Sequence, residues 1–245
     1  MIDNNIKTSP IEELHKLNNA KLVDFAGWSM PIQYHSGIIN EHVSTRNSCG
    51  LFDISHMGQI LISGADSKAL LEKITPSDIE KIKNGRVKYS LLLNNHGGII
   101  DDLMITNEGN GYFLVVNASR TKEGLDEIEN AANSFSDINI NHLEKNGMIA
   151  IQGPKAKDVV GEYFKEVNET MYFMDFINTK YNGNEVRISR IGYTGEDGFE
   201  ISSNSETIFE ITKSISSDER VTMCGLGARD TLCLLYTSPS PRDRT

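Results

Sequence analysis

From residue 59 onward, the spacing of apolar positions switches repeatedly between the period of a strand and that of a helix. Residues 65–74 and 121–135 have apolar positions at helical spacing, and the segments around them have the character of strands. The predicted strands are residues 59–63, 89–93, 99–106, 113–117 and 138–142. The order strand, helix, three strands, helix, strand predicts a ferredoxin-like unit with one additional strand.

A second series of elements follows in a similar order. The expected elements are a strand at residues 148–152, a helix at 154–164, a hairpin at 180–190, a strand at 199–202 and a helix at 205–215. Asn182 and Gly183 predict the turn of the hairpin, because this dipeptide tolerates the left-handed backbone of a tight turn. Ser205 is expected to cap the last helix. Together the two series predict an α+β fold of two units with antiparallel sheets.

The composition of the 245 residues is that of a folded protein, with 38% hydrophobic and 24% charged side chains. Acidic residues outnumber basic ones by 34 to 24, and the formal net charge of −10 disfavours nucleic acid as a partner. No apolar stretch approaches the ~20 residues of a membrane helix, and the N-terminal residues lack the apolar segment of a signal peptide. A cytoplasmic protein that does not enter a membrane is therefore predicted.

Cysteine and histidine positions argue against a disulfide framework and against a metal site. The cysteines Cys49, Cys224 and Cys233 are widely and irregularly spaced, which fits a reducing compartment. The six histidines include no pair at the spacing of helical metal ligands. The segment GLGARD at residues 225–230 lacks the third glycine of a dinucleotide fingerprint, since Asp230 stands in its place.

Two motifs contain residues that suit ligand chemistry. Asp101 and Asp102 interrupt an apolar run and point to opposite faces if the run is a strand, so that one of them is a strand-end carboxylate or a ligand acceptor. Glu200 follows the glycine-rich segment GYTGEDGFE, where its carboxylate can accept two parallel donors from a planar ligand. From the residues alone, the acid pair remains open between these roles, and a solvated position is favoured for Glu200.

Seven segments together resemble one family, the aminomethyltransferase or T-protein of the glycine cleavage system. They are LVDFAGWSMPIQY at residues 22–34, GLFDISHMGQI at 50–60, GGIIDDLMI at 97–105, VVNAS at 115–119, QGPKA at 152–156, SRIGYTGEDGFEI at 189–201 and GLGARDTL at 225–232. The segments occur in the order of the family, and the resemblance covers residues 8–232.

This resemblance implies a tetrahydrofolate-dependent enzyme. Its reaction would take the aminomethyl carbon from the lipoyl arm of the H-protein to tetrahydrofolate, release ammonia and give 5,10-methylenetetrahydrofolate. Asp102 resembles the acid that meets nitrogen 10 of the folate, where it would position the reactants and stabilise positive charge, because an ordinary carboxylate is a poor base at neutral pH. Asp101 would be structural. Glu200 resembles the glutamate that binds the pterin.

Further residues are implied to line the folate channel. Tyr193 resembles a tyrosine of the pterin site and Arg229 an arginine that reaches toward the folate. The positions expected in the channel wall or beside it are Met57, Tyr89, Val115 and Asn117. No metal is implied, and the expected partners are folate and the lipoylated H-protein, bound by a monomer.

The resemblance also predicts the domain organisation. Residues 1–57 and 146–232 would form a discontinuous first folate-binding domain, and residues 58–145 an inserted ferredoxin-like domain. Residues 233–245 depart from the family and are expected to be a non-native tail, so that the C-terminal β domain is missing. The alternatives are a non-catalytic or inactive folate-binding remnant, and the folate domain of a sarcosine- or dimethylglycine-oxidising enzyme.

Overall fold

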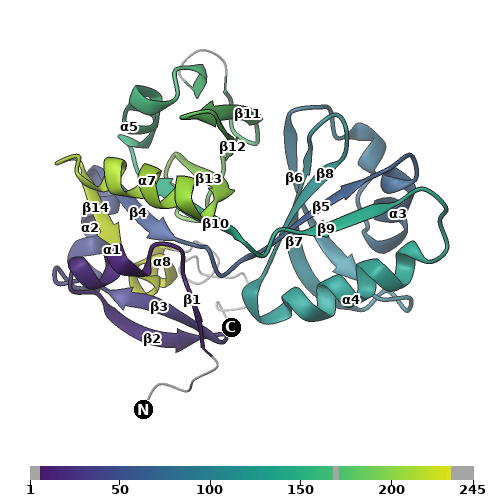
Figure 1. Cartoon of the computed structure of the whole chain (residues 1–245), viewed down its shortest axis with the longest axis horizontal. Helices are drawn as coiled ribbons and strands as arrows, with labels where there is room; N and C mark the ends of the chain where they lie inside the picture. Colours follow the sequence, from purple (N-terminus) through teal and green to yellow (C-terminus); the bar gives the residue numbers. More distant parts are fainter. Residues whose placement is uncertain (1–5, 168–170, 233–245) are drawn as a thin grey trace, which may run out of the picture. The chain divides into compact units, whose positions relative to one another are not determined.

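The computed structural model describes residues 6–167 and 171–232, which form two compact units (Figure 1). Within this range, the first unit comprises residues 6–56, 147–167, 171–173 and 179–232, and the second comprises 57–146 and 174–178. The predicted tail, residues 233–245, lies outside the described residues.

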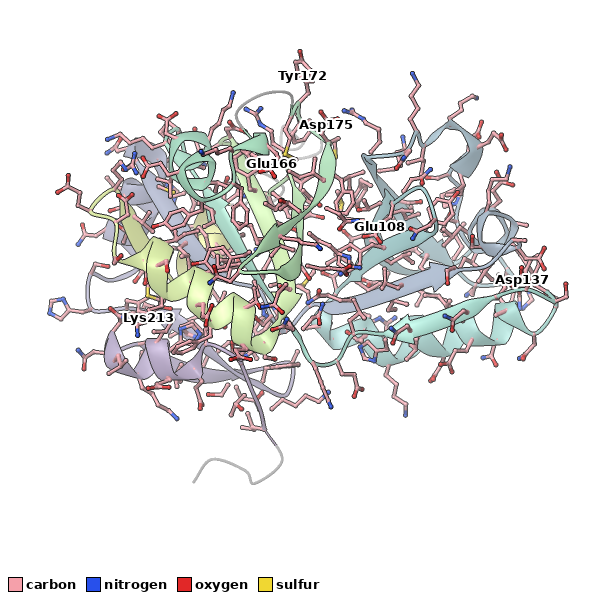
Figure 2. The ribbon with its side chains drawn as sticks, turned by 45° about the horizontal axis from the view of Figure 1, so that its top comes forward. Glu108, Asp137, Glu166, Tyr172, Asp175 and Lys213 are labelled. Atoms are coloured by element: carbon pink, nitrogen blue, oxygen red, sulfur yellow. The ribbon has the colours of Figure 1, made fainter. Side chains whose placement is uncertain are left out.

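Three parts of the predicted division differ from the structure. Met57, Asn146 and residues 174–178 belong to the second unit rather than the first. The segment 174–178 joins it through backbone hydrogen bonds, since the Val87 amide donates to Met174 O at 2.8 Å. The Asp175 carboxylate, labelled in Figure 2, also forms an ion pair with Arg86. These are contacts between segments far apart in the chain, which a local pattern does not reveal.

The second unit contains the predicted ferredoxin-like order of elements. Its elements are β5 (Gly58–Ser63), α3 (Ser67–Ile74), η1 (Ile79–Lys81), β6 (Arg86–Leu93), β7 (Ile99–Asn107), β8 (Tyr112–Val116), η2 (Ala118–Arg120), α4 (Thr121–Ala132) and β9 (Asn139–His142). The strands form one antiparallel sheet in the order β6-β7-β8-β5-β9. Without β6 this is the strand order of a ferredoxin-like sheet, so the prediction of one additional strand is confirmed.

Alternation along the strands gives this sheet a helix-covered face. Ile60, Leu103 and Leu114 belong to one core cluster with residues of α3 and α4 and are at most 2% exposed. Leu70 of α3 and Ile128 of α4 are fully buried against them. Residues one position away on each strand necessarily lie on the opposite face.

The first unit is built around a six-stranded sheet with the order β11-β12-β13-β10-β4-β14. Its strands are β4 (Cys49–Asp53), β10 (Asn146–Gln152), β11 (Phe176–Tyr181), β12 (Asn184–Ser189), β13 (Gly198–Asn204) and β14 (Val221–Cys224). Strand β4 pairs antiparallel with β10 but parallel with β14. A smaller sheet is formed by β1 (Lys7–Thr8), β2 (Lys21–Phe25) and β3 (Trp28–Gln33). The helices given for the described part of the unit are α1 (Glu12–Leu17), α2 (Ile38–Asn47), α5 (Ala156–Tyr163), α7 (Ser205–Ser216) and α8 (Leu226–Leu232). Within the described ranges, no helix combines the length and the hydropathy needed to span a bilayer.

The local signals of the second series agree with the structure except at one cap. Asn182 and Gly183 have φ values of 49° and 86°, as the predicted hairpin turn requires. The cap of α7 is Asn204 and not Ser205, which is the first helical residue. The Asn204 side chain lies outside the helix and accepts a hydrogen bond from the Thr207 amide at 2.9 Å. The prediction of Ser205 was therefore wrong by one residue.

Replacing Asn204 by alanine should lower the free energy of unfolding by about 1 kcal/mol, because the Thr207 amide loses its acceptor. A urea titration measures this change. Asn204→Asp should retain most of the stability, since aspartate caps equally well. Asn130→Ala, on the exposed side of α4, serves as the control and should not lower stability. Equal losses in both alanine variants would remove the capping role.

Candidate functional site

In the second unit, two adjacent acids share one amide at the end of the sheet. Asn117 follows β8, and its Nδ2 donates to Asp101 Oδ1 at 2.8 Å and to Asp102 Oδ1 at 2.7 Å. The Asn117 backbone amide also donates to Asp101 Oδ2 at 3.0 Å. Asp101 is thereby occupied at both oxygens and is 8% exposed, whereas Asp102 is half-buried. Asp101 fastens the ends of β7 and β8 together, and Asp102 is the acid that a ligand can reach.

The strand register gathers several sequence-predicted residues around Asp102. Met104 of β7 lies opposite Tyr89 of β6 on one side and opposite Val115 of β8 on the other. Asp102 is two residues before Met104 on the same strand. Tyr89, Asp102 and Val115 therefore share the face of the sheet that α3 and α4 do not cover. Gly58 pairs with Val116, so that Met57 and Asn117 each lie one residue beyond this pair, at the same end of the sheet.

Tyr89 is available as a hydrogen-bond donor on this face. Its side chain is 43% exposed. Partial burial, then the negative charge of Asp102 and a hydrogen bond to it, and last the charge of Asp101 raise the pKa of Tyr89, which keeps the phenol protonated. A phenol beside a half-buried carboxylate can orient that carboxylate or donate to a polar ligand.

The first unit holds Glu200 in an environment that is unusual for a carboxylate. Glu200 lies in β13 opposite Ser189 and is 6% exposed. Within residues 6–167 and 171–232, no hydrogen bond reaches its carboxylate. Burial raises the pKa of Glu200, and the positive charge of Arg229 opposes this only in part. A buried acid with open acceptor sites is costly unless a ligand provides donors, so this is the strongest ligand-binding signal in the unit.

Arg229 and Tyr193 accompany Glu200. Arg229 belongs to α8, and its Cζ atom lies 5.9 Å from the centre of the Tyr193 ring, within cation–π range. Its charge acts favourably on Glu200. The structure thus brings together Glu200, Arg229 and Tyr193, all three of which the sequence singled out.

His56 is a candidate that the sequence did not single out. It is 5% exposed, and its Nδ1 atom has no hydrogen-bond partner in the described part of the chain. Burial, reinforced by Arg229 and opposed by Asp53, lowers the pKa of His56 to about 4, so the imidazole is neutral. Histidines were considered only as paired metal ligands, and a single imidazole escapes that search. The available signal was its place directly after the buried run CGLFDIS.

A buried hydrogen-bond chain supports the strand that precedes His56. Asp53 Oδ2 and His15 Nε2 are 2.8 Å apart, and His15 Nδ1 and the Tyr34 hydroxyl are also 2.8 Å apart. Burial raises the pKa of Tyr34, so its hydroxyl stays protonated and donates to His15, which in turn donates to Asp53. Burial alone would raise the pKa of Asp53, but the hydrogen bond from His15 lowers it overall. Asp53 Oδ1 then accepts from the Ser55 amide at 2.9 Å, which fixes the segment leading to His56.

Among known proteins, the chain is similar to aminomethyltransferases. It is 41% identical to the aminomethyltransferase of Staphylococcus saprophyticus over 95% of this chain and 64% of that protein. It is 39% identical to the mitochondrial aminomethyltransferase of Dictyostelium discoideum over 94% of this chain and 60% of that protein. The crystal structure of the glycine cleavage system aminomethyltransferase T from Bartonella henselae superposes with a TM-score of 0.88 at 38% identity, covering 96% of this chain and 64% of that one.

A more distant likeness concerns the fold alone. The heterotetrameric sarcosine oxidase from Corynebacterium sp. U-96 matches with a TM-score of 0.52 at 17% identity over 85% of this chain and 94% of that one. The chain spans 60 to 65% of the length of the first curated relatives. The family description "GCVT N-terminal domain" matches residues 11–235. The resemblance drawn from the seven segments is thereby confirmed, and the chain belongs to the GCVT N-terminal domain family.

Proposed function

We propose that the chain acts in glycine cleavage as a tetrahydrofolate-dependent aminomethyltransferase. The aminomethyl carbon of the loaded H-protein would lose its bonds to the lipoyl sulfur and to the amino group and form bonds to nitrogens 5 and 10 of tetrahydrofolate. The two protons leaving these nitrogens would pass to the sulfur and to the amino group. The products would be the free dithiol, ammonia and 5,10-methylenetetrahydrofolate.

The observation that carries this proposal is the buried Glu200 carboxylate without a hydrogen-bond donor. The pterin 2-amino group and the adjacent ring N–H are two parallel donors, which match the two oxygens of a carboxylate. The positive charge of Arg229 would favour the ionised form of Glu200, which accepts both donors, and so oppose the effect of burial in part. His56 and Tyr193 supply further polar and aromatic surface in the same unit.

Asp102 would act on the reacting carbon rather than on the pterin. Its carboxylate is held by the Asn117 amide at one oxygen and is half-buried. A fixed negative charge of this kind stabilises positive charge that develops as the carbon leaves the sulfur. Tyr89, on the same face of the sheet, would help to orient the carboxylate. No metal is part of this proposal.

The compartment and the assembly are also proposals. Cys49 and Cys224 are buried free thiols, and burial raises the pKa of each to about 12, so that both stay protonated. Cysteines outside disulfides are typical of a reducing compartment, and we place the protein in the cytoplasm as a monomer, although the relative from Dictyostelium discoideum is named mitochondrial.

Two measurements test the function in sequence. Titration of tetrahydrofolate against the purified chain should show saturable binding. Ammonia should then be released only when tetrahydrofolate and aminomethyl-loaded H-protein are both present, with unloaded H-protein as the control. Absence of folate binding would contradict the proposal.

A second candidate is a folate-binding chain that does not transfer the carbon. It depends on the Glu200 environment alone, which would bind the pterin without any role for Asp102. Folate binding without ammonia release would establish this second candidate in place of the first.

A further inference from the structure

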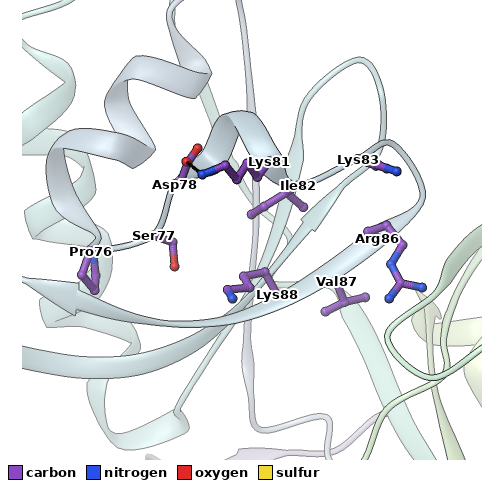
Figure 3. Close-up of a pocket in the computed structure, with 9 residues that line it drawn as sticks. All are labelled: Pro76, Ser77, Asp78, Lys81, Ile82, Lys83, Arg86, Val87 and Lys88. Carbon is purple, nitrogen blue, oxygen red and sulfur yellow. Dashed lines mark ion pairs between the residues drawn. The ribbon is translucent and has the colours of Figure 1, made fainter.

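The second unit contains a pocket of about 690 Å³ that the residues discussed so far do not line (Figure 3). It lies between the segment that follows α3, including η1, and the start of β6. Its lining residues are Pro76, Ser77, Asp78, Lys81, Ile82, Lys83, Arg86, Val87 and Lys88. Lys88 pairs with Ile105 on β7, so it lies on the face of the sheet opposite to that of Tyr89 and Asp102. Val87, which pairs with Thr106, lies on the Tyr89 face, but none of the nine lining residues belongs to the Asp102 site of this unit.

Hydrogen bonds hold the walls of the pocket in place. Asn107 Nδ2 donates to Ile82 O at 2.7 Å, and the Gly85 amide donates to Asn107 O at 2.9 Å. The Ser77 and Ser90 hydroxyls, 2.8 Å apart, tie the segment after α3 to β6. The pocket is thus formed before any ligand arrives, which lowers the entropy lost on binding.

The lining is strongly basic in a chain with a formal charge of −10. Four of the nine lining residues are cations, and Asp78 is the only acid. Lys81 is paired with Asp78 at 2.7 Å (Figure 3), and Arg86 is paired with Asp175. Lys83 and Lys88 are exposed and form no ion pair with any residue the structure describes. Two cations in this pocket are therefore free to bind an external anion.

The arrangement of the cations favours an extended ligand. Arg86 and Lys88 are two residues apart in β6, so their side chains extend from the same face of that strand, and Lys83 lies three residues before Arg86. Alternate side chains of an extended peptide are ~6.6 Å apart on one side, so a row of carboxylates on such a peptide matches a row of cations. Ile82 and Val87, 7% and 5% exposed, form an apolar base for the aliphatic parts of the ligand.

A protective role against aggregation explains only part of this pattern. Lysine on an edge strand such as β6 discourages pairing with other strands. That role would account for Lys88 but not for Lys81 and Lys83, which precede the strand and line the same cavity. We propose that the basic pocket, defined by the nine residues above, docks an extended acidic segment of a protein partner, whose carboxylates are bound by Lys83 and Lys88.

Fluorescence anisotropy with a labelled peptide of alternating glutamate and serine tests the proposal. The chain should bind this peptide, should not bind the corresponding glutamine peptide, and should bind more weakly as salt rises. The double variant Lys83→Glu/Lys88→Glu should weaken binding at least about tenfold, because two attractions become repulsions. The matched control is Lys122→Glu/Lys213→Glu, which makes the same change of charge at exposed positions on α4 and α7. Lys213 is labelled in Figure 2.

Several results would overturn this inference. They are failure of the chain to bind the glutamate peptide, equal weakening in both double variants, and displacement of the peptide by millimolar inorganic phosphate, which would indicate a site for small anions. Preferential binding of a single-stranded oligonucleotide of equal charge would also overturn it. Lys83→Glu/Lys88→Glu should leave tetrahydrofolate binding unchanged, so the docking site and the proposed function can fail separately.

Discussion

Replacing Glu200 by glutamine is expected to weaken tetrahydrofolate binding about 100-fold and, at the same time, to make the unliganded chain more resistant to heat. The loss of affinity follows because an amide presents one acceptor and one donor where the pterin edge needs two acceptors. The gain in stability follows because the variant no longer buries an ionised carboxylate without hydrogen-bond donors. Isothermal titration and thermal unfolding measure the two effects.

The pH dependence of stability has a defined sign. Burial raises the folded-state pKa of Glu200 above its unfolded value, so the folded state binds the proton more tightly. The cost of the buried charge is fully present above the folded pKa and is relieved as the pH falls through it. Glu200→Gln should therefore exceed the unaltered chain in stability most clearly at neutral and alkaline pH, and the difference should shrink in acid.

Folate affinity should change with pH in the opposite sense. The ionised carboxylate is the form that accepts both donors, so affinity should fall as the pH drops through the raised pKa of Glu200. The control is Glu206→Gln, which removes an exposed acid in α7 and should alter neither affinity nor its pH dependence. Unchanged folate affinity in Glu200→Gln would exclude Glu200 from the pterin site.

Features that depend on residues close together in the sequence were predictable from the sequence. The elements of the second unit follow from the spacing of apolar positions, because helices and strands that share one core bury residues at different periods. The turn at Asn182 and Gly183 follows from backbone sterics alone. The accessible position of Asp102 depended on the family resemblance, because the strand pattern requires only that two adjacent acids face opposite ways.

Features that depend on distant residues were not predictable in this way. The parallel pairing of β14 with β4 and the association of residues 174–178 with β6 are tertiary contacts without a local signature. His56 became a candidate only when its burial and its unpaired Nδ1 atom were known. The residues alone favoured a solvated position for Glu200, but its carboxylate is buried. The sequence of the segment does not reveal this burial.

Replacing Asp102 by asparagine should keep folate affinity within about tenfold but lower ammonia release about 100-fold or more, because the fixed charge contributes to the transition state and not to pterin binding. The fold should tolerate the change, since the asparagine carbonyl can still accept from Asn117 Nδ2. Initial rates at saturating folate and varied loaded H-protein should show a loss in kcat with little change in KM.

The matched control for this experiment is Asp126→Asn, an exposed acid on α4 of the same unit, which should leave the rate unchanged. An equal loss of rate in both variants would assign that loss to the electrostatic field of the whole protein instead of to Asp102. An unchanged rate in Asp102→Asn would remove this residue from the mechanism, and a parallel loss of folate affinity would make it a binding residue. A selective loss of kcat would leave Glu200 to bind the pterin and Asp102 to stabilise the reacting carbon.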